Sequence, residues 1–95
     1  MSVRFAWDRQ KATRNVKDHE GVTFEEAATV FRDALAYIFD DEEHSDEEYR
    51  ELIIGYSQRK RLLIVSFTER QDVVRIISAR KADANEQVEY EYARR

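Results

Sequence analysis

Six arginines lie on, or at the ends of, three predicted strands in the second half of this 95-residue chain. A guanidinium stays charged and binds phosphate through two parallel hydrogen bonds. A sheet that presents several of them together could therefore hold an RNA backbone and stabilise a phosphorane-like transition state without a metal. The alternative is a ring of solvated charges paired with Glu51, Glu69 and Asp72. The six residues are Arg50, Arg59, Arg61, Arg70, Arg75 and Arg80.

Arg80 is the strongest candidate of this set because it closes an apolar run, IISAR. Side chains alternate between the two faces of a strand, so the sequence predicts that Arg80 shares one face with Ser78, Ile76 and Val74. A rigid sheet would fix the direction in which the Arg80 side chain points.

The two histidines are candidate general bases, since the ordinary pKa of histidine, about 6.5, lies near neutral pH. His19 lies near the predicted end of the first helix, where a cation is favourable, and we expect only that role for it. His44 precedes the strand that carries Arg50, which makes it the better candidate. The sequence has no Ser/His/Asp signature, phosphate-binding glycine loop or dinucleotide fingerprint, so no cofactor is expected.

An acidic segment, DDEEHSDEEYRE at residues 40–51, offers oxygen ligands for a divalent cation. A calcium loop needs donors at alternating positions and a glycine for its sharp turn, and the segment has neither. We therefore expect a solvated loop and no metal site. The possible ligands are Asp40, Asp41, Glu42, Glu43, His44 and Asp46.

The net charge of −4 hides an uneven distribution of charge. Residues 40–51 carry −7, and the remaining 83 residues carry +3, so an acidic segment is attached to a mildly basic body. The chain has no cysteine, which excludes disulfides, thiolate nucleophiles and zinc sites with Cys ligands. The apolar runs are far shorter than the roughly 18 to 20 residues of a membrane span, and no signal peptide is recognisable, so a cytoplasmic protein is expected.

The first half of the chain predicts a strand, two helices and an extended segment. Alternation over 3–7 indicates the strand, and Asp8 fits the N-cap of a helix running toward Lys17 that ends in a left-handed cap at Gly21. Thr23 and Glu26 have the spacing of a capping box before a second helix, on which Glu26 is expected to face solvent. Residues 35–39 should be extended.

The second half predicts an antiparallel meander over 49–56, 61–68 and 73–80, followed by a polar helix over 82–94. The expected architecture is an α+β fold, β-α-α-β-β-β-β-α, with a mainly antiparallel sheet packed by helices. Residues 1–95 should form one domain, because two cores would each be marginal in a chain of this length.

Several stretches, in this order, resemble the BrnT family of bacterial toxins. They are FAWD at 5–8 with Lys11 and Asn15, GVTFEEAATVF at 21–31, HS at 44–45, the Arg50 to Gly55 spacing, FTER at 67–70 and RIISARKA at 75–82. The resemblance covers nearly the whole chain.

This resemblance implies a RelE-like fold and a metal-independent ribonuclease that arrests translation in the cytoplasm. It also implies a BrnA-like antitoxin partner, with no direct DNA binding except through the complex with that antitoxin. The implied base is His44 or a nearby carboxylate such as Glu48. The arginines implied around the phosphate are Arg50, Arg61, Arg70 and Arg80.

Three departures from the family pattern remove positive charge. Residues 83–88 read DANEQV where the family is rich in arginine, Asp18 replaces a usual lysine, and Glu20 is an added acid before Gly21. A toxin homologue that has lost activity and serves as an antitoxin-binding module is therefore the alternative function, and a plain dimeric structural domain is a third.

Overall fold

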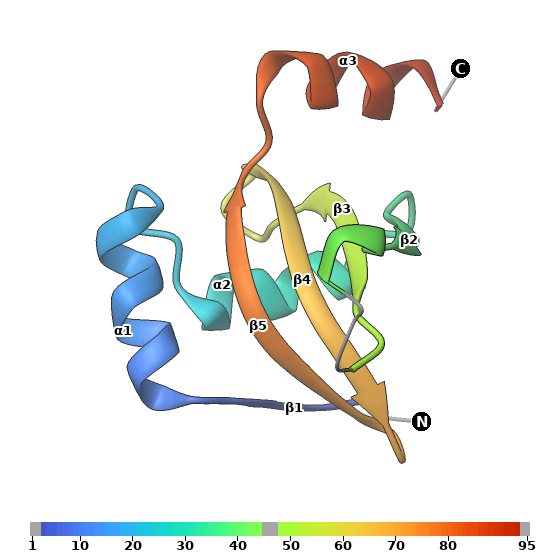
Figure 1. The fold of residues 1–95 in the computed structure, drawn as a ribbon. Helices are drawn as coiled ribbons and strands as arrows, with labels where there is room; N and C mark the ends of the chain where they lie inside the picture. Colours follow the sequence, from blue (N-terminus) through green and yellow to red (C-terminus); the bar gives the residue numbers. More distant parts are fainter. Residues whose placement is uncertain (1–2, 45–47, 94–95) are drawn as a thin grey trace.

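The computed structural model describes residues 3–44 and 48–93, and these form an α+β fold (Figure 1). The first half of the chain contains β1 (Arg4–Trp7), α1 (Arg9–Asp18), α2 (Phe24–Thr29) and β2 (Tyr37–Asp40). The second half contains β3 (Glu51–Tyr56), β4 (Leu62–Arg70), β5 (Val73–Lys81) and α3 (Ala84–Tyr92). Two short 3-10 helices, η1 (Val30–Arg32) and η2 (Glu42–His44), flank β2. The predicted α+β class is confirmed.

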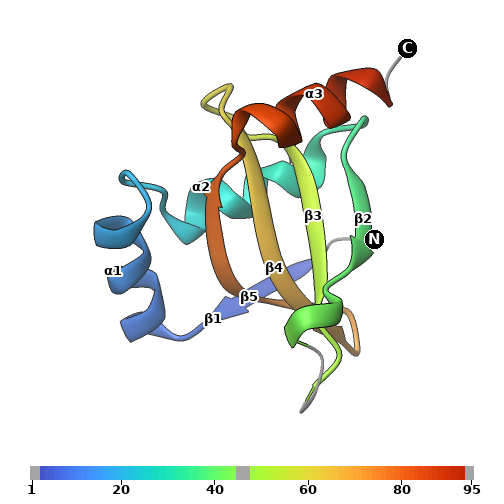
Figure 2. The ribbon, with the colours of Figure 1, turned by 45° about the horizontal axis from the view of Figure 1, so that its top comes forward.

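The strands form one mixed sheet in the order β1-β5-β4-β3-β2. The neighbours from β2 to β5 are antiparallel, as the short connections between them require, and β1 pairs in parallel with β5. Helix α2 covers one face of the sheet, which we call the core face, and α3 crosses one end of the opposite face (Figure 2). We call this second face the groove face.

The core lies between the core face and the helical layer. In the helical layer the core side chains recur at helical spacing, and in the strands they occupy alternate positions. Each layer therefore presents one apolar side to the other. Fully or almost fully buried members are Val22, Phe24, Ala27, Val30, Ile53, Leu63, Val65, Phe67, Val74, Ile76 and Ala79.

A β-bulge in β5 corrects the predicted alternation along that strand. Ser66 pairs with Ser78 but the next residue, Phe67, pairs with Ile76, so one extra residue of β5 lies between the two pairs. One extra residue in a strand turns every side chain after it to the opposite face of the sheet. Val74 and Ile76 therefore lie in the core, whereas Ser78 and Arg80 line the groove face. The prediction that all four share one face was wrong.

Asn15 of α1 ties this helix to β5 just beyond the bulge. Its amide nitrogen donates to the carbonyls of Ala79, at 2.8 Å, and Val22, at 2.9 Å, and its oxygen accepts from the N–H of Ala79 at 3.1 Å. The side chain thus occupies the hydrogen-bonding edge of β5 past the residues that pair with β1. The Asn15 side chain is buried, so water cannot reach these backbone groups. Asn15 supplies the hydrogen bonds that they would otherwise lack.

The helix ends follow the sequence signals in part. Asp8 caps α1 as predicted, accepting from the Lys11 N–H at 3.0 Å, and both Glu20 and Gly21 adopt positive φ after the helix. Thr23 caps α2 through the Glu26 N–H, but the Glu26 side chain does not complete a capping box. Glu26 is instead buried, so its predicted exposure was wrong.

Helix α3 is held on the groove face by Tyr90. The Tyr90 ring packs with Ile54, Leu62 and Ile64, and its hydroxyl donates to Asp33 at 2.9 Å. The other large apolar residues of α3, Val88 and Tyr92, are exposed. A complete capping box of Asp83 and Glu86, which the sequence analysis did not predict, starts the helix. None of the helices in residues 3–44 and 48–93 has the length and hydrophobicity of a membrane-spanning segment.

We predict that Asn15→Ala lowers the free energy of unfolding by about 3 kcal/mol, because it leaves buried backbone groups of Ala79 and Val22 without partners. Urea unfolding followed by circular dichroism measures this. Thr13→Ala, on the exposed side of the same helix, is the matched control and should change stability by less than about 0.5 kcal/mol. Equal effects of the two changes would contradict the role given to Asn15.

Candidate functional site

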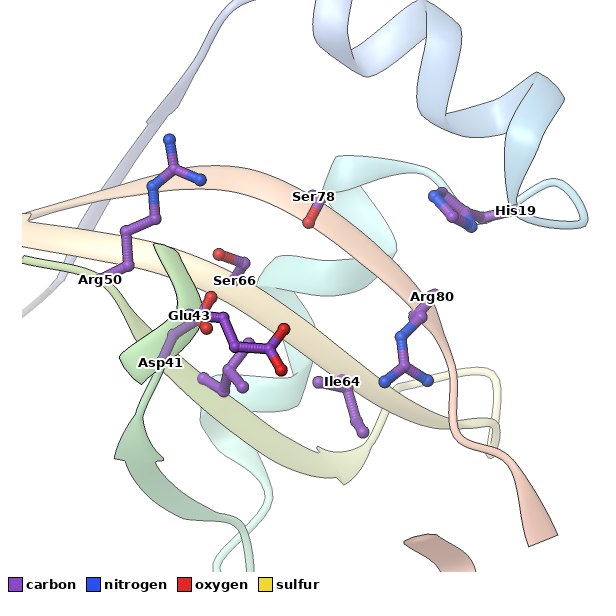
Figure 3. Close-up of a pocket in the computed structure, with 9 residues that line it drawn as sticks. His19, Asp41, Glu43, Arg50, Ile64, Ser66, Ser78 and Arg80 are labelled. Atoms are coloured by element: carbon purple, nitrogen blue, oxygen red, sulfur yellow. The ribbon is translucent and has the colours of Figure 1, made fainter. Parts of the chain in front are cut away.

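A groove of about 280 Å³ lies on the groove face and brings two of the predicted arginines together (Figure 3). Arg50 lies at one end and Arg80 at the other, with two serine hydroxyls between them. Leu52 and Ile64 give the groove an apolar wall, and further lining comes from His19 after α1 and from Asp41 and Glu43 at η2. The lining residues are His19, Asp41, Glu43, Arg50, Leu52, Ile64, Ser66, Ser78 and Arg80.

The register of the central strands fixes these positions. Leu52 of β3 pairs with Ser66 of β4, which pairs with Ser78 of β5, and Ile64 pairs with Arg80. Paired residues point to the same side of a sheet, so the two rows form a continuous surface. The groove therefore depends on the bulge, which alone turns Ser78 and Arg80 toward this side.

The guanidinium of Arg80 is bound by a carboxylate through two parallel hydrogen bonds. Its two terminal nitrogens donate to the two oxygens of Glu86 at 2.8 and 2.7 Å. Hydrogen bonding to Glu86 raises the pKa of Arg80, and the same bonds lower the pKa of Glu86. This is the bidentate geometry in which arginine binds phosphate. Arg80 is thus arranged to bind an oxyanion, and a side chain of α3 provides one.

Arg50 and the η2 segment form the other end of the groove. The Asp41 N–H donates to the Arg50 carbonyl at 3.0 Å, which places η2 beside the strand. The guanidinium of Arg50 lies 3.7 Å from the carboxylate of Glu48, and Asp41 and Glu43 line the same groove. Cationic and anionic groups therefore alternate along it, as a site that binds phosphate and transfers a proton requires.

Arg70 and Glu48 line a second cavity, of about 390 Å³, together with Arg75 and Tyr49. The Tyr49 hydroxyl donates to Asp40, and this bond raises the pKa of Tyr49 to about 12. The phenol therefore stays protonated at neutral pH. The structure places Arg70 on the same side of the sheet as Arg75, in a cavity separate from the groove of Arg50 and Arg80.

Arg61 lies outside both cavities, in a partly buried cluster with the buried Glu26. Its guanidinium donates two hydrogen bonds to the Glu26 carboxylate, one of them at 2.9 Å from Nε, and Ser57 donates a third at 2.7 Å. The Arg61 bond is the largest cause that lowers the pKa of Glu26. These contacts give Arg61 a structural role, joining α2 to the turn between β3 and β4.

The backbone of His44 ends η2, close in sequence to the groove residues Asp41 and Glu43, but its side chain lies outside the described part of the structure. Asp46, a residue of the metal alternative, is also outside it. Within residues 3–44 and 48–93, no group of three histidine, aspartate or glutamate side chains is placed to hold a metal.

Sequence reasoning missed His19 and Ser66 as groove residues. His19 was assigned only to the helix end, and it reaches the groove because the Asn15 side chain ties the end of α1 to β5, a tertiary contact that the sequence analysis did not assign to Asn15. Ser66 did leave a signal, since it is the polar residue inside the apolar run LLIVSF. A hydroxyl in such a strand indicates a face that is not wholly packed.

Comparison with known proteins gives one family. The family described as "Ribonuclease toxin, BrnT, of type II toxin-antitoxin system" matches residues 7–86. The crystal structure of the Brucella abortus ribonuclease toxin, BrnT, superposes with a TM-score of 0.66 at 21% identity and covers 86% of this chain and 99% of that chain. This similarity shows a shared fold. No curated protein matches the sequence significantly.

We predict that Glu26→Gln lowers the free energy of unfolding at pH 7 by about 2 kcal/mol, because Arg61 loses its charged partner. The pKa of Glu26 is lowered in the folded state, so its contribution is present above the ordinary value near 4.5 and is lost as the pH falls through the folded value. The stability difference between the two proteins should therefore shrink in acid. Glu25→Gln, one residue earlier and exposed, is the control; an equal loss there would contradict the assignment.

We also predict that Glu86→Gln strengthens the binding of inorganic phosphate to the groove by about fivefold, because Arg80 keeps its charge and loses its competing carboxylate. Glutamine still fits the capping box, so α3 should remain folded. NMR titration of the Arg80 Nε–H signal measures the affinity. Glu89→Gln makes the same change of charge on an exposed position of α3, and an equal gain there would show a general charge effect only.

Proposed function

Because the chain belongs to the BrnT family of ribonuclease toxins of type II toxin-antitoxin systems, we propose that it is an endoribonuclease that binds the scissile phosphate of RNA in the groove between Arg50 and Arg80. One observation carries the proposal. Arg50, which immediately precedes β3, and Arg80 of β5 line a single groove, and Arg80 already holds an oxyanion in bidentate geometry. The fold that positions them is shared with the Brucella toxin.

The proposed reaction uses the RNA's own nucleophile. The 2′-oxygen attacks the adjacent phosphorus, a base removes the 2′-hydroxyl proton, and the bond from phosphorus to the 5′-oxygen breaks as that oxygen takes up a proton. Arg50 and Arg80 stabilise the negative charge that builds on the phosphate oxygens. These guanidinium groups supply the positive charge, so the proposed reaction proceeds without a metal ion.

The base is one of a small set of groups near the groove. The family resemblance implies His44 or Glu48, and Glu48 lies beside Arg50. The geometry adds His19 and Glu43, which line the groove itself. An imidazole on one side and a carboxylate on the other suit an acid and a base acting on opposite sides of one phosphate. Arg70 would then contact RNA outside the reacting centre, and Arg61 would not contact it.

The proposed partner is a BrnA-like antitoxin, and the proposed effect is arrest of translation in the bacterial cytoplasm. Neutralisation by an antitoxin is what membership of a type II toxin-antitoxin family implies. If the antitoxin is a basic protein, the acidic segment at residues 40–51 would speed their association and make it sensitive to salt.

A second candidate function, an antitoxin-binding module with weak or no nuclease activity, is favoured by the acids around the groove. Glu86 neutralises Arg80, and Asp41 and Glu43 line the same groove. Residues 83–88, which include Glu86, carry no arginine. Each acid lowers the local attraction for phosphate, which would weaken RNA cleavage.

We predict that Arg50→Gln and Arg80→Gln each reduce RNA cleavage by at least about 100-fold and abolish growth arrest on induced expression, because each removes a stabilising charge from the reacting phosphate. Cleavage of a labelled RNA by purified protein and growth with and without the antitoxin measure this. Arg32→Gln, an exposed arginine outside the groove, is the control. Thermal unfolding of every variant confirms that it is folded.

The same assays decide between the two functions. Growth arrest that the antitoxin relieves, together with cleavage that needs Arg50 and Arg80, supports the nuclease. A folded wild-type protein that binds the antitoxin but neither cleaves RNA nor slows growth would reject the nuclease and support the binding module.

A further inference from the structure

The outer face of α1 is a basic surface that the proposed reaction does not use. Five residues of this helix line a shallow hollow of about 440 Å³: Arg9, Gln10, Thr13, Arg14 and Lys17. Three are cations, and Gln10 adds an amide that can donate to phosphate oxygens, whereas the Thr13 hydroxyl donates to the Arg9 carbonyl. None is acidic and none is a large apolar residue. We call these five residues the α1 surface.

The α1 surface is held rigidly and its cations have no acidic partners among residues 3–44 and 48–93. Ala12 and Asn15 pack against the sheet on the opposite side of the helix, which fixes its orientation. No ion pair within those residues involves the cations of the α1 surface, whereas Arg59, Arg61, Arg80 and Lys81 each lie beside a carboxylate. The cations are therefore available to an external anion.

The α1 surface leads to the groove. Helix α1 ends at Asp18, and the next residue, His19, lines the groove beside Ser78 and Arg80 (Figure 3). Arg9 and Lys17 are two turns apart, a rise of about 12 Å along the helix. A strand whose phosphate lies in the groove can thus continue past His19 and along the helix.

We propose that the α1 surface binds the sugar-phosphate backbone of the RNA strand that extends from the groove. The inference rests on the proposed function and adds a second, non-catalytic contact with the same substrate. Charge complementarity favours a polyanion, and the absence of a large apolar or aromatic anchor among the five residues argues against a protein partner. Backbone contacts of this kind strengthen binding without regard to sequence.

The test compares two double variants that remove one arginine and one lysine each. Arg14→Gln with Lys17→Gln alters the α1 surface, and Arg32→Gln with Lys60→Gln alters exposed cations elsewhere. The probe is a fluorescent single-stranded RNA of about 12 nucleotides, 2′-O-methylated throughout so that it cannot be cleaved. Fluorescence anisotropy gives its affinity over a range of salt concentrations.

We expect the α1 variant to bind the probe about five to ten times more weakly than wild type. The slope of log affinity against log salt should fall in magnitude by about 1.4, as the loss of two phosphate contacts on a single strand requires. The control variant should keep most of the wild-type affinity. Circular dichroism establishes that both variants are folded.

Two results would overturn the inference without affecting the proposed function. One is equal binding by the two double variants while wild-type protein cleaves RNA. The other is binding of polyglutamate that depends on Arg14 and Lys17 as strongly as binding of RNA does, which would indicate an acidic protein partner. Wild-type protein that neither binds the probe nor cleaves RNA would overturn the inference and the proposed function together.

Discussion

The hydrogen bonds between Asn15 and the backbone of Ala79 are the constraint on which the rest of the structure depends. They fix α1 against the edge of β5 at the point where β1 no longer pairs with it. The third bond, to the Val22 carbonyl, holds the turn that carries His19. One buried amide thereby positions the helix, the turn and the end of the strand that bears Arg80. The place of His19 at the groove and the orientation of the α1 surface both follow from where this residue lies.

The basic residues of the chain fall into classes that sequence does not distinguish. Arg61 forms a partly buried pair with Glu26 and thereby joins α2 to the turn between β3 and β4. Arg80 is paired as well, but on the groove face, where its partner belongs to a short helix at the end of the chain. The cations of the α1 surface form no ion pair within the described residues. The role of a basic residue in this chain therefore depends on which acidic side chains the fold places next to it.

Much of the fold was predictable because its signals are local. Alternation along the strands, the Asp8 and Thr23 caps and the glycine after α1 each depend on neighbouring residues, and the structure contains each of them. The bulge between Ile76 and Ser78 was not predictable, since it depends on how β5 meets β4. Because of the extra residue in this bulge, Ser78 and Arg80 lie on the opposite face of the sheet from Val74 and Ile76.

The candidate site was predictable only as far as residue type allowed. Arg50 and Arg80 were chosen for their chemistry and their strands, and the sheet does bring them to one groove. Arg61 was chosen for the same reasons but meets a glutamate that the helical pattern placed in solvent. His19 lies at the groove because the contact between Asn15 and Ala79 holds the end of α1 against β5. Contacts between residues far apart in sequence decided each of these outcomes.

If the groove binds RNA as proposed, the pairing of Arg80 with Glu86 would make it selective for the length of its ligand. A carboxylate on the same chain competes at an effective concentration of the order of millimolar, independently of how much protein is present. Free phosphate or a single nucleotide has only one contact with which to displace it. A long strand has many, because its further phosphates can be bound by other cations while one replaces the carboxylate. Under the proposed function, Glu86 would therefore be a tethered competitor that sets a lower limit on the length of RNA able to occupy the groove.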